Sequence, residues 1–182
     1  MNIRLKKDRV IVIAFVILSL GSLIYVAYAT ANYLPFFSAL NQLQMKVLKV
    51  VLSGGGNPDQ TAMYVQFQVS NPGAYSGFEV YSSSASLDFF VTDNSSITLF
   101  TAQPLLAGSI IRSTLGANSQ FSTNLIVPLS PSNRTSLVQF DNQYGSKVRA
   151  HVTMTVDIVT FLNPVVGHTH LIDDNSFPLS AS

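Results

Sequence analysis

The chain has 182 residues, of which 10% are charged, with a formal net charge of +1 and no cysteine. This length suits one membrane anchor and one domain with its own core, and so small a net charge gives no support for a nucleic-acid partner. The lack of cysteine excludes disulfides, thiolate metal sites and a cysteine nucleophile. Ser, Thr, Asn and Gln supply the polarity instead, which is typical of secreted and cell-surface domains.

The N-terminal part of the sequence predicts a membrane anchor. Residues 10–31 hold no charge and follow the basic segment 1–9. A helix of this length reaches about 33 Å at ~1.5 Å per residue, enough for a bilayer core of ~30 Å. Basic residues tend to stay in the cytoplasm. We therefore expect a single-pass protein of the cell membrane, with a cytoplasmic tail (1–9), a transmembrane helix (10–31) in the lipid bilayer and an extracytoplasmic domain.

Two features near the end of this apolar run bear on where the anchor ends. The triplet Ala27-Tyr28-Ala29 also fits a signal-peptide cleavage site, but the run is longer than the usual apolar region of such a peptide, which favours a retained anchor. Pro35 predicts a kink or the end of the helix, because the residue before a proline is pushed out of the α region. Residues 32–42 are therefore expected to form a membrane-proximal linker.

Residues 43–164 predict a β domain. Apolar and polar residues alternate in several short segments separated by turns rich in Gly, Asn and Pro, which is the pattern of half-buried strands. The one convincing helix of the domain begins at Ser130-Pro131 and stops at Gly145. The pattern predicts a mainly β protein, an antiparallel immunoglobulin- or fibronectin-like sandwich with one short helix behind a single N-terminal transmembrane helix. Residues 165–182 are expected to be a final extended piece or a loose tail.

Two of these segments carry a resemblance to a known family. Residues 63–72, MYVQFQVSNP, and residues 121–129, FSTNLIVPL, resemble the late-embryogenesis-abundant group 2 domain, also called the water-stress and hypersensitive-response domain. The resemblance covers residues 43–162 and departs from the family at Gly73, where a second Asn is usual. It implies an immunoglobulin-like sandwich, a membrane-anchored form, and a stress-associated or interaction role without catalytic residues.

The most site-like cluster of residues is near the C-terminus. His168 and His170 are two apart, so in a strand both imidazoles face one side and can reach one Zn²⁺ or Cu²⁺. Asp173 is the expected third ligand, with Asp174 or His151 as alternatives. The competing interpretation is a polar tail with chance histidines. No other cofactor is expected.

Other motifs indicate modification rather than catalysis. Asn94 and Asn133 begin N-glycosylation acceptor triplets in predicted turns. The sequence has no Gly-x-Ser-x-Gly elbow, and Glu79 is its only glutamate, so neither a serine hydrolase nor a paired-carboxylate mechanism is supported. We therefore expect a protein that is not an enzyme.

Two functions fit these expectations. The first is a structural or protein-interaction module on the outer side of the membrane, such as a subunit of a cell-envelope or membrane complex, with protein partners or self-assembly. The alternative is a pilin-like subunit whose N-terminal helix packs in an extracellular filament. A leader-peptidase site would favour the second function, but Val10 directly follows Arg9 and no small residue lies there.

Overall fold

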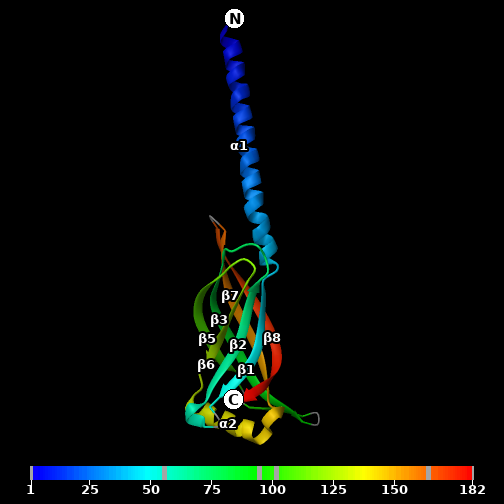
Figure 1. Ribbon diagram of the computed structural model, residues 1–182, viewed down its shortest axis with the longest axis vertical. Helices are drawn as coiled ribbons and strands as arrows, with labels where there is room; N and C mark the ends of the chain where they lie inside the picture. Colours follow the sequence, from blue (N-terminus) through cyan, green and yellow to red (C-terminus); the bar gives the residue numbers. More distant parts are fainter. Residues whose placement is uncertain (1, 55–56, 94–95, 101–102, 163–164, 182) are drawn as a thin grey trace.

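The computed structural model describes residues 2–54, 57–93, 96–100, 103–162 and 165–181. A long helix leads into a β domain, and a second helix lies at the far end of that domain (Figure 1). The elements in chain order are α1 (Asn2–Leu40), β1 (Gln44–Ser53), η1 (Pro58–Gln60), β2 (Ala62–Asn71), β3 (Phe78–Asp93), β4 (Ser96–Leu99), β5 (Leu105–Leu115), β6 (Ser119–Val127), α2 (Pro131–Tyr144), η2 (Gly145–Lys147), β7 (Arg149–Leu162) and β8 (Val165–Ala181).

Helix α1 is, among the described residues, the one helix long and apolar enough to cross a membrane by length and composition. All residues from 9 to 28 are exposed. The helix continues through Pro35 to Leu40, so the predicted end at Pro35 is not seen and most of the expected linker 32–42 is helical. Proline removes one helical hydrogen bond. Burial of Phe36 and Ala39 in the domain stabilises the turn that follows.

Aromatic side chains join α1 to the β domain. The Phe36 ring packs against the rings of Tyr75 and Phe78, with centroid distances of 5.3 and 6.1 Å. The Tyr75 hydroxyl donates a hydrogen bond to the carbonyl of Phe161 at the end of β7. Burial raises the pKa of Tyr75 above its ordinary value. The last turns of α1 therefore belong to the core of the domain.

The strands form one sheet in the order β4-β3-β7-β8-β1-β2-β6, with β5 also paired to β3. Strand β8 pairs antiparallel with β7 and parallel with β1, which connects the two halves of the sheet. The sheet is barrel-like (Figure 1). The predicted mainly β fold behind an N-terminal helix is confirmed, whereas the immunoglobulin-like sandwich stays a prediction. The pairing of β1 with β8 also differs from the all-antiparallel arrangement expected.

Alternation of apolar and polar residues sets which side chains fill the interior. In β2 every second residue is buried, because successive side chains of a strand point to opposite faces. The buried set of each strand therefore faces the interior of the sheet. Strand β3 is one continuous strand, and its irregularity is a register shift between Val80 and Ser82. Of the two alternatives for residues 165–182, the structure has the extended one through Ala181. The largest fully buried side chains include Phe67, Phe78, Phe89, Met63, Leu125 and Met154.

Helix α2 lies at the end of the barrel opposite α1 (Figure 1). Its predicted start is confirmed, since the Ser130 hydroxyl accepts a hydrogen bond from the backbone N–H of Asn133 and Pro131 occupies the first turn. Its predicted stop is confirmed at Gly145, which has a positive φ of 55°. Leu137 and Val138 are its buried residues. This helix therefore packs on the barrel along only part of its surface.

Candidate binding groove

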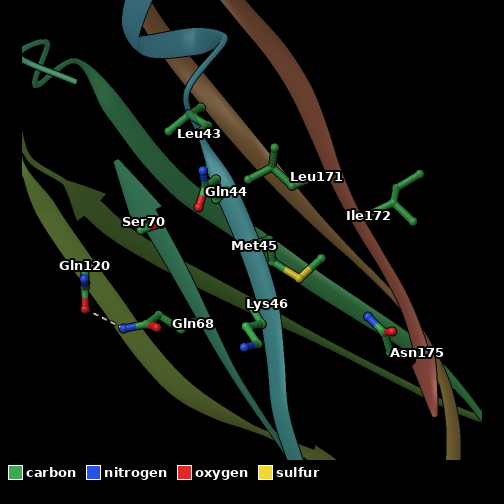
Figure 2. Close-up of a pocket in the computed structure, with 10 residues that line it drawn as sticks. All are labelled: Leu43, Gln44, Met45, Lys46, Gln68, Ser70, Gln120, Leu171, Ile172 and Asn175. Carbon is green, nitrogen blue, oxygen red and sulfur yellow. Dashed lines mark hydrogen bonds between the residues drawn. The ribbon is translucent and has the colours of Figure 1, made fainter. Parts of the chain in front are cut away.

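A concave feature lies beside the first half of β1, and its lining residues come from β8, β1, β2 and β6. Strands β1 and β8 are paired only where Val50–Leu52 of β1 meet Leu179–Ala181 of β8. Towards α1 a groove of about 690 Å³ extends from β8 across β1 to β2 and β6 (Figure 2). That volume is within the range of ligand clefts in proteins.

A β-bulge accounts for the end of the pairing. The register of β1 on β2 shifts between Val47 and Lys49, so Leu48 is an extra residue in β1. A bulge bends the strand that carries it and increases the local twist. The bulge lies between the half of β1 that pairs with β8 and the half that borders the groove. We infer that it turns the first half of β1 away from β8.

The groove combines apolar side chains between the strands with polar side chains along its edges. Leu43 is buried and Met45 and Leu171 are half-buried, whereas Gln44, Lys46 and the neighbouring polar residues lie further out (Figure 2). Side-chain amides are unusually frequent, and Lys46 is the charged residue of the lining. The full lining is Leu43, Gln44, Met45, Lys46, Gln68, Ser70, Gln120, Leu171, Ile172 and Asn175.

One carboxylate connects the two strands beside the groove. The Asp173 Oδ2 atom of β8 accepts a hydrogen bond of 2.6 Å from the backbone N–H of Val47 in β1. The Asp173 Oδ1 atom accepts another from the side-chain amide of Asn175. A side chain thus takes the place of the backbone carbonyl that a paired strand would offer to Val47.

On the opposite edge of the groove, the Gln68 Nε2 atom donates a hydrogen bond of 2.6 Å to Gln120 Oε1 (Figure 2). This bond connects the exposed faces of β2 and β6. Amide side chains carry both donors and acceptors, so they can bond either group of a peptide or a hydroxyl. The groove therefore offers hydrogen bonding and apolar surface, which is the chemistry of a binding site.

The predicted metal ligands do not all meet. His168 and His170 lie on the same face of β8, as expected, and both approach Asp157 of β7, with Nδ1 to Oδ1 distances of 3.5 and 3.6 Å. Asp173 lies on the other face of the strand, where it contacts Val47. Across the described ranges, no group of three or more His, Cys, Asp or Glu residues is arranged to hold a metal ion. The metal site stays a prediction.

The two alternative ligands form a separate pair. His151 Nε2 lies 3.2 Å from Asp174 Oδ1, which also accepts a hydrogen bond of 2.8 Å from the Thr153 hydroxyl. His151 Nδ1 lies 3.2 Å from the hydroxyl of Ser176. These contacts lie on exposed side chains of β7 and β8, where ion pairs contribute little to stability.

The two predicted glycosylation sites differ in setting. Asn94 lies outside the described residues. Asn133 is in the first turn of α2, not in a turn between elements, and it is half-buried. Glycosylation of both residues stays a prediction.

Sequence reasoning missed the groove. Its residues come from four strands that are distant in the chain, and each strand alone shows only ordinary alternation. Residues 171–175 were expected in an extended piece or tail, so no partner strand could be assigned to them. The only local signal was Asp173, a carboxylate on the inward set of alternate β8 residues, and the sequence assigned it to a metal.

No family model matches the sequence. No curated protein matches it either. Solved structures with a similar arrangement include AT1g01470 from Arabidopsis thaliana, which is 15% identical over 76% of this chain and 82% of its own, with a TM-score of 0.45. Spo0M, a sporulation control protein from Bacillus subtilis, is 10% identical over 77% of this chain and 50% of its own, with a TM-score of 0.35.

A third similar structure is AvmM, described as catalysing macrocyclization in alchivemycin A biosynthesis. It is 8% identical over 77% of this chain and 88% of its own, with a TM-score of 0.37. At these identities and TM-scores, none of the three carries an inference about what this chain does.

Proposed function

We propose that this chain is a membrane-anchored interaction module, with α1 in the lipid bilayer and the β domain on the extracytoplasmic side. The observation that carries the proposal is the exposed apolar surface of α1, which covers residues 10–28 on all sides before the helix enters the domain core. Exposed apolar surface of this extent is unfavourable in water and favourable in hydrocarbon. The basic residues before it favour a cytoplasmic N-terminus.

The groove beside the first half of β1 supports an interaction role for the domain. It begins within three residues of the end of α1, so a bound partner would lie near the membrane surface. The resemblance to late-embryogenesis-abundant group 2 domains, with the sandwich and the stress-associated role it implies, is part of the same proposal. Nothing in the lining requires a cofactor for binding.

The lack of cysteine allows a direct test of topology. Single-cysteine variants Asn2→Cys and Ser122→Cys are expressed in intact cells and treated with a maleimide that does not cross membranes. Ser122 is exposed on β6, so we expect Ser122→Cys to react and Asn2→Cys to react only after permeabilisation. The protein is also expected to remain in the membrane after alkaline extraction. Reaction of Asn2→Cys alone in intact cells, or release at high pH, would contradict the proposal.

The pilin-like alternative is favoured by one observation, the length of α1. Its 39 residues span about 58 Å, roughly twice the thickness of a bilayer core. A helix packed in a filament core would use the exposed part of that length, before the last turns that are buried in the domain. Mass spectrometry separates the two functions, because an intact Met1 in detergent-extracted protein supports the anchor, whereas a shortened N-terminus in a sheared extracellular fraction supports the filament.

A further inference from the structure

Each of the two strands beside the groove has an edge without a ladder partner. Strand β1 pairs with β2 along its length, but with β8 only at Val50–Leu52. Strand β8 pairs with β7 from Val165 to Pro178, and with β1 only beyond that point. Within the described part of the chain, the first half of β1 therefore borders the groove with one edge unpaired. Unpaired strand edges are templates for pairing with another chain.

The hydrogen bond to Asp173 shows which backbone groups of β1 face the groove. Val47 donates its backbone N–H towards β8. The backbone N–H and carbonyl of a residue two positions away on the same strand point in the same direction. The N–H and carbonyl of Met45 are therefore directed to the groove, while those of Gln44 and Lys46 belong to the β2 ladder. The edge already binds one acceptor, the Asp173 carboxylate, in the position of a strand carbonyl.

The side chains around this edge suit an extended peptide. Leu43 and the first three residues of β1, Gln44 to Lys46, all line the groove. Since successive side chains point to opposite faces, a cavity that touches all four meets the strand at its edge. Apolar residues between β1 and β8 can take alternate side chains of a guest. Of the lining amides, Gln44 and Asn175 belong to the two strands beside the guest, whereas Gln68 and Gln120 lie beyond β1 on β2 and β6. Lys46 favours a guest with an acidic residue at the end of the groove.

We propose that the groove binds an extended peptide segment of a partner protein, which adds a strand along the free edge of β1. The guest carbonyls bond the N–H groups of Met45 and Val47, and the Asp173 carboxylate competes with the guest for Val47. The proposal deepens the interaction role proposed above, and depends on it only for the location of the partner near the membrane.

The test uses the full chain in lipid nanodiscs and a defined probe. The probe is an end-capped, fluorescent peptide of alternating valine and threonine with a glutamate at each end, and binding is measured by fluorescence anisotropy. A second peptide has the same side chains but carries N-methyl groups on alternate backbone nitrogens. We expect the N-methyl peptide to bind about tenfold more weakly or not at all, because it cannot form the ladder. Equal affinity of the two peptides would overturn the proposal.

A pair of variants tests the competition at Val47. Replacing Asp173 with Ala (Asp173→Ala) frees the Val47 N–H, so the unmodified probe is expected to bind about tenfold more tightly. Asp174→Ala is the matched control, because Asp174 is the next residue and lies on the other face of β8. If the affinity for the probe does not rise in Asp173→Ala, or rises equally in Asp173→Ala and Asp174→Ala, the proposed competition for Val47 is wrong. If Asp173→Ala does not fold, the comparison of the two peptides on the wild-type chain still decides.

Other outcomes are also informative. Binding of oleate, with no binding of either peptide, would show that the groove takes acyl chains and would overturn the peptide proposal. If the probe peptide does not bind but the cysteine labelling gives the expected topology, only the peptide-binding proposal is wrong. Incorrect labelling with normal peptide binding would overturn the membrane topology and leave the groove assignment standing.

Discussion

Asn71 explains, at the scale of a single residue, why a strand of this domain ends in Asn-Pro. It is fully buried, and its Nδ2 atom donates hydrogen bonds to the carbonyls of Tyr75 and Gly116 at 2.7 and 2.8 Å. Its Oδ1 atom accepts a bond of 3.0 Å from the N–H of Gly73. One side chain thus pairs backbone groups in two separate turns, and both turns lie at the end of the barrel next to α1.

We predict that Asn71→Asp lowers the free energy of unfolding by roughly 3–5 kcal/mol. The aspartate keeps the acceptor for Gly73 but removes both donors and places a charge beside two carbonyl oxygens. Chemical denaturation of the full chain measures the effect. Asn124→Asp is the control, because Asn124 is exposed on β6, and we expect it to change stability by less than about 0.5 kcal/mol. Similar losses in both variants would show that the buried network is not the cause.

The contact between α1 and the β domain depends on close packing at the scale of elements. Ala39 is fully buried against Gly73, in the loop that follows β2. A Cβ atom added at Gly73 would lie 2.6 Å from Ala39 Cα and would overlap Ala39 Cβ. Only glycine at this position leaves room for the helix.

We predict that Gly73→Ala loosens α1 from the domain. Overpacking against Ala39 should lower the free energy of unfolding by about 1–3 kcal/mol. Spin labels on Val26→Cys in α1 and Ile126→Cys in β6 report the geometry, since both positions are exposed and the chain has no other cysteine. The distance distribution between the labels should broaden. Gly108→Ala should leave it unchanged, because the nearest atom to a Cβ there is 3.7 Å away. An unchanged distribution in both variants would refute the packing argument.

At the scale of the whole molecule, the short pairing of β8 with β1 joins the two halves of the sheet. Leu179 is buried, pairs with Val50, and donates its N–H to the carbonyl of Val148 at 3.0 Å. The bulge at Leu48 ends this pairing on one side. The same few residues therefore close the sheet and set where the groove begins.

We predict that Leu179→Ala costs about 2–4 kcal/mol of stability, as expected for truncating a buried leucine. Amide hydrogen exchange should become faster at Val50–Leu52, the residues that pair with this end of β8. Ile172→Ala is the control, since Ile172 is 67% exposed on the same strand. Uniformly faster exchange across the chain, with no preference for the three residues, would show that Leu179 does not close the sheet.

The sequence by itself determined the features that depend on local pattern. A long apolar run makes a helix, a period of two makes a strand with one buried face, and Ser130-Pro131 begins a helix, because each of these is decided by residues close together in the chain. The His168 and His170 pair was placed on one face for the same reason.

Only the tertiary structure decided which strands are neighbours. A period of two says which face of a strand is buried but not which strand lies beside it, so the position of β8 between β7 and β1 was not predictable. The groove, the bond from Val47 to Asp173 and the approach of Asp157 to the two histidines all follow from that position. They depend on contacts between residues more than ten positions apart in the chain, and no local pattern of residue types encodes such pairings.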